Sequence, residues 1–92
     1  MTGIELIAQE RKEQIEKHGI SVKNDVSLNK DGQLLNAARK LLIEGKISDV
    51  ILHNPPKAWN KPIWMRMCNK TYKQRLIIAG ALIAAELDRL QN

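Results

Sequence analysis

The sequence contains no phenylalanine, and its only aromatic residues are Trp59, Trp64 and Tyr72. The core must therefore be built from aliphatic side chains and alanine. Cys68 is the only cysteine, which excludes an intramolecular disulfide and a metal site made of paired cysteines. A catalytic thiol would need a base nearby, and the spacing between Cys68 and His53 does not indicate such a pair.

The sequence also lacks a long apolar run and a recognisable signal peptide. The longest apolar segment, Leu76–Ala85, has ten residues, whereas a helix needs about 20 to cross a bilayer. The start, Met1–Glu5, is acidic and amphipathic, with no basic region followed by an apolar block. We expect a cytoplasmic protein, in a cell or an infected cell, with a single domain over residues 1–92.

Helical patterns dominate the chain. Thr2 with Glu5, and Thr71 with Gln74, fit capping boxes that open a first helix and a last one. Apolar residues at helical spacing predict another helix over Leu34–Leu42. The fold class predicted is all-α, a small bundle of about three main helices. A long, irregular and basic connection is expected before the last helix, because prolines interrupt that stretch.

The last helix is apolar on every side between Leu76 and Ala85. A surface helix would show one apolar stripe, so this pattern predicts an enclosed helix. Two short partner helices can hardly cover it. We therefore expect close helix contacts, within the chain or in a homo-oligomer, at small residues: Gly80, Ala81, Ala84 and Ala85.

Acidic residues are absent between Val50 and Ala85, and this segment accounts for more than the whole net charge of +5. It holds six Lys and Arg residues together with all three aromatics. Cations suit phosphate oxygens, and an indole ring can stack on a base. The segment thus predicts a phosphorylated nucleotide, linear or cyclic, as ligand. The candidate ligand-binding residues are Trp59, Lys61, Trp64, Arg66, Lys70, Lys73 and Arg75.

Other interpretations of this segment stay open. It could be a solvated basic loop whose indole rings cap a thin core. Nucleic acid is a rival partner for a basic surface, but no zinc, homeodomain or RNA-recognition signature occurs, and nucleic acid is not favoured. A metal-dependent hydrolase would need converging carboxylates for Mg²⁺. Glu10 and Glu13 offer one pair on the first helix, but no second pair is complete elsewhere.

Several motifs resemble small helical proteins of phages and prophages that are mostly uncharacterised. They are Ile7–Ile15 followed by Gly19 and Asp25, then Leu34 with Ala37 and Ala38, Trp59 with Lys61-Pro62, Arg75-Leu76, Ala79–Ile83 and Ala85–Leu87. That group in turn looks like the all-α MazG-like nucleotide pyrophosphohydrolases, which are helical oligomers that use carboxylates and Mg²⁺. The resemblance adds Arg11 and Gln14 as candidate ligand contacts.

Two functions therefore compete. One is a binder that holds a nucleotide without cleaving it, needs no cofactor, and could sequester a signalling nucleotide of host defence. The other is a MazG-like, Mg²⁺-dependent nucleoside-triphosphate diphosphohydrolase with Glu10, Glu13 and Glu86 as metal ligands. Gln33 stands where the resemblance implies a glutamate, and a neutral amide binds Mg²⁺ poorly, which favours the binder. A protein-binding inhibitor is a further alternative.

Overall fold

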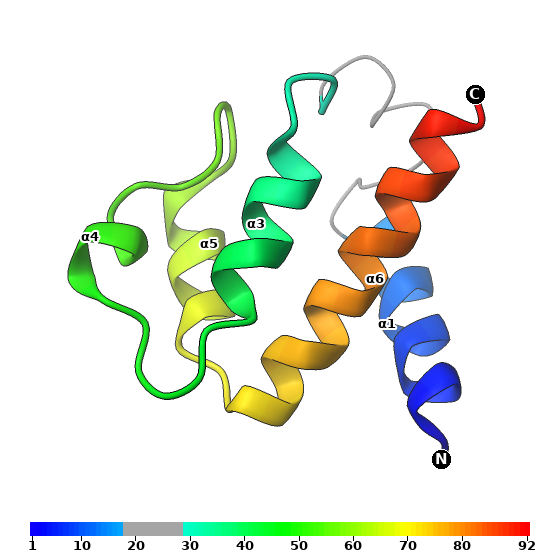
Figure 1. Cartoon of the computed structure of the whole chain (residues 1–92), viewed down its shortest axis with the longest axis horizontal. Helices are drawn as coiled ribbons and strands as arrows, with labels where there is room; N and C mark the ends of the chain where they lie inside the picture. The colour runs from blue at the N-terminus through cyan, green and yellow to red at the C-terminus, as the bar shows by residue number, and fades with distance from the viewer. Residues whose placement is uncertain (18–28) are drawn as a thin grey trace.

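The computed structural model describes residues 1–17 and 29–92, and these ranges contain helices and no strand (Figure 1). The predicted all-α class is confirmed. Most of the expected loop over Ile20–Asp31 lies outside the described residues. Within them, no helix is both long and apolar enough to cross a membrane. The helices are α1 (Gly3–Lys17), α3 (Gln33–Leu41), α4 (Asp49–Leu52), α5 (Lys61–Cys68) and α6 (Tyr72–Leu90).

Helix α6 is the centre of the fold. It packs most extensively on α3 and α1. α3 runs antiparallel to it on one side and α1 lies on the other (Figure 1). α4 and α5 form a second, smaller unit beside α3 (Figure 1). The core joins α3, α5 and α6. It is mostly aliphatic, as the lack of phenylalanine predicts, but its largest fully buried side chain is Trp64. Its other members are Leu34, Ala37, Ala38, Leu41, Ile47, Cys68, Ile78, Ala79, Leu82 and Ala85.

Both predicted capping boxes are present. At the start of α1, the Glu5 amide donates to Thr2 Oγ1 at 3.2 Å, and the Thr2 amide donates to Glu5 Oε1 at 2.9 Å. The hydrogen bond from the Thr2 amide to its carboxylate, with a further contribution from the Thr2 hydroxyl, lowers the pKa of Glu5. Thr71 and Gln74 make the same pair of bonds at the start of α6. Local side-chain chemistry thus fixes where both helices begin.

The expected irregular connection before α6 is wrong in part, because α5 occupies Lys61–Cys68. Asn60 caps this helix by accepting from the Ile63 amide at 3.0 Å. Pro62 lies in the first turn, where a missing amide hydrogen removes no helical hydrogen bond. The proline therefore starts a helix here, whereas we had expected it to interrupt the chain.

A single chain encloses α6 only in part. Leu76 is 38% exposed and Ile83 is 42% exposed, whereas Ala81 and Ala85 are fully buried inside the chain. Gly80 meets α1, since a Cβ placed on it would lie 2.7 Å from Ile7 Cδ1. Small residues thus bring helices close within one chain, and one side of α6 stays open.

Arg75 ties the end of α3 to the start of α6. It is only 4% exposed. Nη1 donates to the Ile43 carbonyl at 2.7 Å and to the Leu41 carbonyl at 3.4 Å, and Nη2 donates to the Gly45 carbonyl at 2.6 Å. Nε donates to the carbonyl of Lys70 at 3.2 Å. The end of a helix leaves carbonyls without partners. The Arg75 guanidinium supplies donors to the carbonyls at the end of α3 and in the segment that follows it.

We predict that Arg75→Ala lowers the free energy of unfolding by about 3 kcal/mol, because four carbonyls, most of them partly buried, lose charged donors. Arg75→Lys should lose most of the same amount, since one ammonium cannot reproduce the planar fork of donors. Arg66→Ala removes an exposed cation and should change stability by less than about 0.5 kcal/mol. Urea denaturation followed by circular dichroism measures all three. Equal stability of Arg75→Ala and Arg66→Ala would contradict the role given to Arg75.

Candidate functional site

The two tryptophans pack against each other. Their ring centroids lie 6.2 Å apart in an edge-to-face arrangement. Trp64 is fully buried, and its Nε1 donates to the Ile51 carbonyl at 2.9 Å. Trp59 is half-buried, and its Nε1 donates to Asn29 Oδ1 at 2.8 Å. Trp64 is therefore a core residue, and only Trp59 has ring surface left for stacking.

Three other candidate residues are engaged in packing between helices. Arg75 gives its donors to backbone carbonyls, as described above. Arg11 is buried on α1 and forms an ion pair with Asp88 of α6 at 3.3 Å. Gln14 is 1% exposed, and its Nε2 donates to the Ile78 carbonyl at 3.4 Å. These contacts hold α1 and α3 against α6 and give all three side chains a structural role.

The remaining predicted cations are exposed. Lys61 opens α5, Arg66 lies near its end, and Lys70 and Lys73 flank the start of α6. No carboxylate among the described residues forms an ion pair with any of these four side chains. Lys57 differs, because it pairs with Asp31 at 3.1 Å. The acid-free segment thus leaves unneutralised charge at the corner between α5 and α6.

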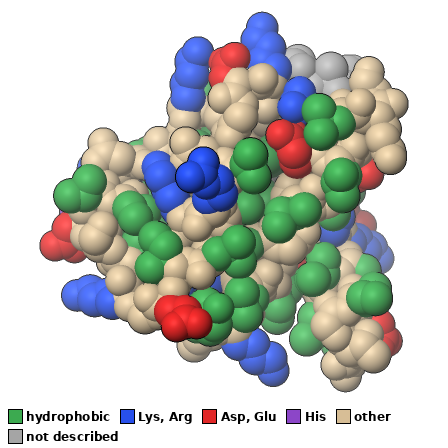
Figure 2. Space-filling model, viewed as in Figure 1, with side chains coloured by type: hydrophobic (Ala, Val, Ile, Leu, Met, Phe, Trp, Pro, Cys, Tyr) green, Lys and Arg blue, Asp and Glu red, His purple; other side chains and the backbone are tan. Residues whose placement is uncertain are grey.

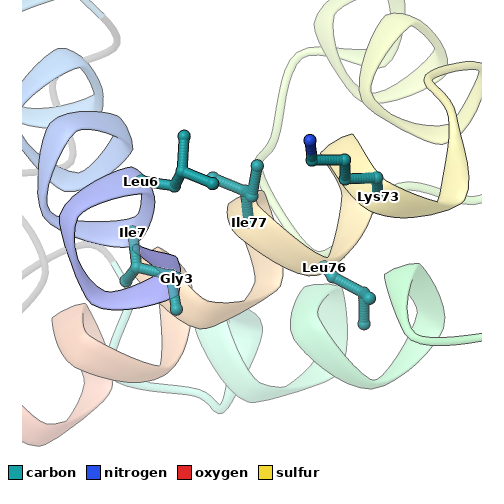
Figure 3. Close-up of a pocket in the computed structure, with 6 residues that line it drawn as sticks. All are labelled: Gly3, Leu6, Ile7, Lys73, Leu76 and Ile77. Carbon is teal, nitrogen blue, oxygen red and sulfur yellow. The ribbon is translucent and has the colours of Figure 1, made fainter. Parts of the chain in front are cut away.

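A shallow pocket of about 230 Å³ lies between α1 and α6, and the sequence did not reveal it (Figure 3). Leu6 and Ile77 approach each other across it, and Lys73 brings the only charged group to its lining (Figure 3). Its walls are otherwise apolar. We call it the α1–α6 pocket, lined by Gly3, Leu6, Ile7, Lys73, Leu76 and Ile77.

The α1–α6 pocket joins one predicted residue, Lys73, to side chains that carried no chemical signal in the sequence. Leu6, Ile7, Leu76 and Ile77 look like ordinary helix-packing residues, and helical spacing explains them without a ligand. Only the contact between two helices far apart in the chain makes them line one surface. The pocket could therefore not be found from any single segment.

The carboxylates considered for Mg²⁺ are not gathered into a cluster. Across residues 1–17 and 29–92, no group of three His, Cys, Asp or Glu side chains could hold a metal ion. Glu10 accepts from Gln14 Nε2 at 3.3 Å, and Glu86 pairs with Arg89. Gln33 Oε1 accepts from the Asp31 amide at 2.8 Å, which stabilises the turn before α3. The side-chain amide of Gln33 thus has a local structural partner.

Comparison of the chain with protein-family models, curated proteins and solved structures gives no match. The resemblance to phage proteins and to MazG-like enzymes therefore stays a prediction. The function must be argued from the residues themselves.

Cys68 has the properties of an inert thiol. It is 4% exposed, and burial raises its pKa to about 11 despite the opposing charges of Arg75 and Lys40. A neutral thiol is a poor nucleophile.

We predict that at pH 8 a thiol-reactive dye labels the native protein at least about 100-fold more slowly than the urea-unfolded chain, because burial and the raised pKa of Cys68 leave little exposed thiolate. Equal labelling rates, followed by absorbance, would contradict this placement.

Proposed function

We propose that this chain binds a phosphorylated nucleotide without cleaving it, with the phosphates at the start of α6 and the base against the α1–α6 pocket. The observation that carries the proposal is the position of Lys73, an exposed and unpaired cation on the rim of an apolar pocket. Nucleotide sites combine such an apolar surface with a few placed polar groups.

The phosphate end is supported by charge and by backbone geometry. Lys70 and Lys73 flank Thr71, the residue that caps α6. The start of a helix carries about half a positive charge, and the capping box uses the amides of Thr71 and Gln74 but leaves those of Tyr72 and Lys73 for an anion. No acidic residue lies in the first turn of α6. The cations at this end therefore add to the helix field, and a bound phosphate would relieve their mutual repulsion.

The base is better matched to the pocket than to the tryptophans. A volume of about 230 Å³ is below the roughly 300–1,000 Å³ of sites that enclose a drug-sized ligand. It suits one flat group with the phosphates outside. Trp64 would have to leave the core to stack on a base. Arg75 would have to give up its carbonyls. Both are therefore left out of the proposed site, and Arg66 is retained as an outer cation.

We predict that Lys70→Glu with Lys73→Glu weakens nucleotide binding at least about 100-fold, because two charge-assisted contacts to phosphate become repulsive. Binding is measured by incubating the protein with a panel of linear and cyclic nucleotides plus Mg²⁺, removing unbound nucleotide, denaturing the protein and separating the released ligand by chromatography. Intact nucleotide recovered from the wild-type protein, and lost from the double variant, is the expected result.

Lys12→Glu is the matched control, since Lys12 is an exposed lysine of α1 that does not line the pocket. It should retain nucleotide as the wild type does. Recovery of monophosphate or pyrophosphate would contradict binding without cleavage and favour the hydrolase. Failure to retain any nucleotide would remove both. Equal loss in the Lys12 control and in the double variant would show that only the net charge matters.

A further inference from the structure

One side of α6 carries a continuous row of exposed aliphatic residues. Leu76, Ile83, Leu87 and Leu90 are 38%, 42%, 56% and 65% exposed. They are spaced by seven, four and three residues, which places them in one narrow stripe along the helix. We call these four residues the α6 stripe. It lies between the sides of α6 that pack on α1 and on α3.

The α6 stripe carries no charge, and the two acidic residues of α6 beside it are already paired. Glu86 pairs with Arg89, and Asp88 pairs with Arg11 of α1. A partner that covers the stripe would therefore not leave a new unpaired charge in a dry interface, which is the main cost of burying ionic residues. The surface is suited to an apolar partner and offers nothing that selects a charged one.

The broad face that contains the stripe is large enough for a stable contact. The molecule measures 34 × 33 × 20 Å, so it is a slab with two wide faces. Figure 2 shows hydrophobic side chains following the course of α6 across one of them. A standard interface buries about 800 Å² per partner, and a face of these dimensions can supply that area.

We infer that the α6 stripe binds the same stripe of a second copy of this chain, with the two α6 helices antiparallel. Rows spaced by three and four residues are the pattern through which helices pack side by side. A two-fold axis near Ile83 pairs that residue with its equivalent and Leu76 with Leu90, so the apolar row matches itself. The inference does not rest on nucleotide binding.

The antiparallel arrangement follows from charge. The start of α6 carries the exposed cations Lys70 and Lys73 as well as the positive end of the helix dipole. Parallel helices would place both cationic ends together and would repel. Antiparallel helices hold these ends apart at opposite edges of the pair.

Ile83→Glu with Leu87→Glu tests the interface. We expect the wild-type protein to have twice the 10.5 kDa mass of the chain in light scattering at micromolar concentration. The double variant should weaken the dimer at least about 100-fold, since it places charges in an apolar contact. Val50→Glu is the matched control, because Val50 is an aliphatic residue of α4 that is 74% exposed outside the stripe. It should remain dimeric.

Circular dichroism of all three proteins must show the same helical content, so that loss of the dimer is not loss of the fold. A monomeric wild type at micromolar concentration would overturn the inference. So would a double variant that dimerises as Val50→Glu does, since another surface would then be used. Capture of a different protein by the stripe while the chain stays monomeric would assign the surface to a foreign partner.

Single cysteines test the direction of the helices in a Cys68→Ala background. Leu76→Cys and Leu90→Cys, oxidised separately, should give little disulfide dimer, whereas a mixture of the two should cross-link. Efficient cross-linking of Leu76→Cys with itself would overturn the antiparallel arrangement. Gel electrophoresis without reductant reads the result, and nucleotide binding plays no part in it.

Discussion

The contact of one buried guanidinium with the chain that follows α3 sets the geometry of the rest of the molecule. Arg75 lies at the start of α6 and reaches carbonyls at Leu41, Ile43 and Gly45. It thereby fixes the end of one helix against the start of another and makes them antiparallel neighbours. The exposed cations at the start of α6 owe their position to this contact. The segment that gives the chain its excess charge is thus held by its one buried cation.

A core without phenylalanine explains the shape of the protein. Alanine-rich contacts let α3 and α1 approach α6 closely, with Ala81 and Ala85 fully buried. Such contacts fill little volume, so two helices and a small α4–α5 unit cover only part of α6. The result is a slab 20 Å thick that leaves one side of its central helix uncovered. Apolar composition alone therefore overstated how much of α6 the chain can enclose.

Sequence reasoning succeeded where a few neighbouring residues decide the structure. Both capping boxes depend on side chains three residues apart, and both are present. It failed at Pro62, which was read as a break although Asn60 two residues earlier supplies the cap that makes it a helix start. It also failed where distant contacts decide. Trp64 and Arg75 looked like ligand contacts because an indole ring can stack on a base and a guanidinium can bind phosphate. Both side chains are buried, and their partners, the carbonyls of Ile51 and of the end of α3 and the segment after it, come from parts of the chain that no local pattern connects to them.

The candidate site and the α6 stripe meet at Leu76, which lines the α1–α6 pocket and also begins the stripe. In an antiparallel pair of chains, Leu90 of the second copy faces Leu76 and adds apolar surface beside the pocket. A pocket of about 230 Å³ between α1 and α6 is shallow, and a wall from a second chain would make it deeper. Binding would then shift the equilibrium toward the pair, since a ligand stabilises the state that holds it more tightly. On this interpretation, the open side of α6 and the small volume of the pocket have the same cause, which is that a single chain buries α6 only in part.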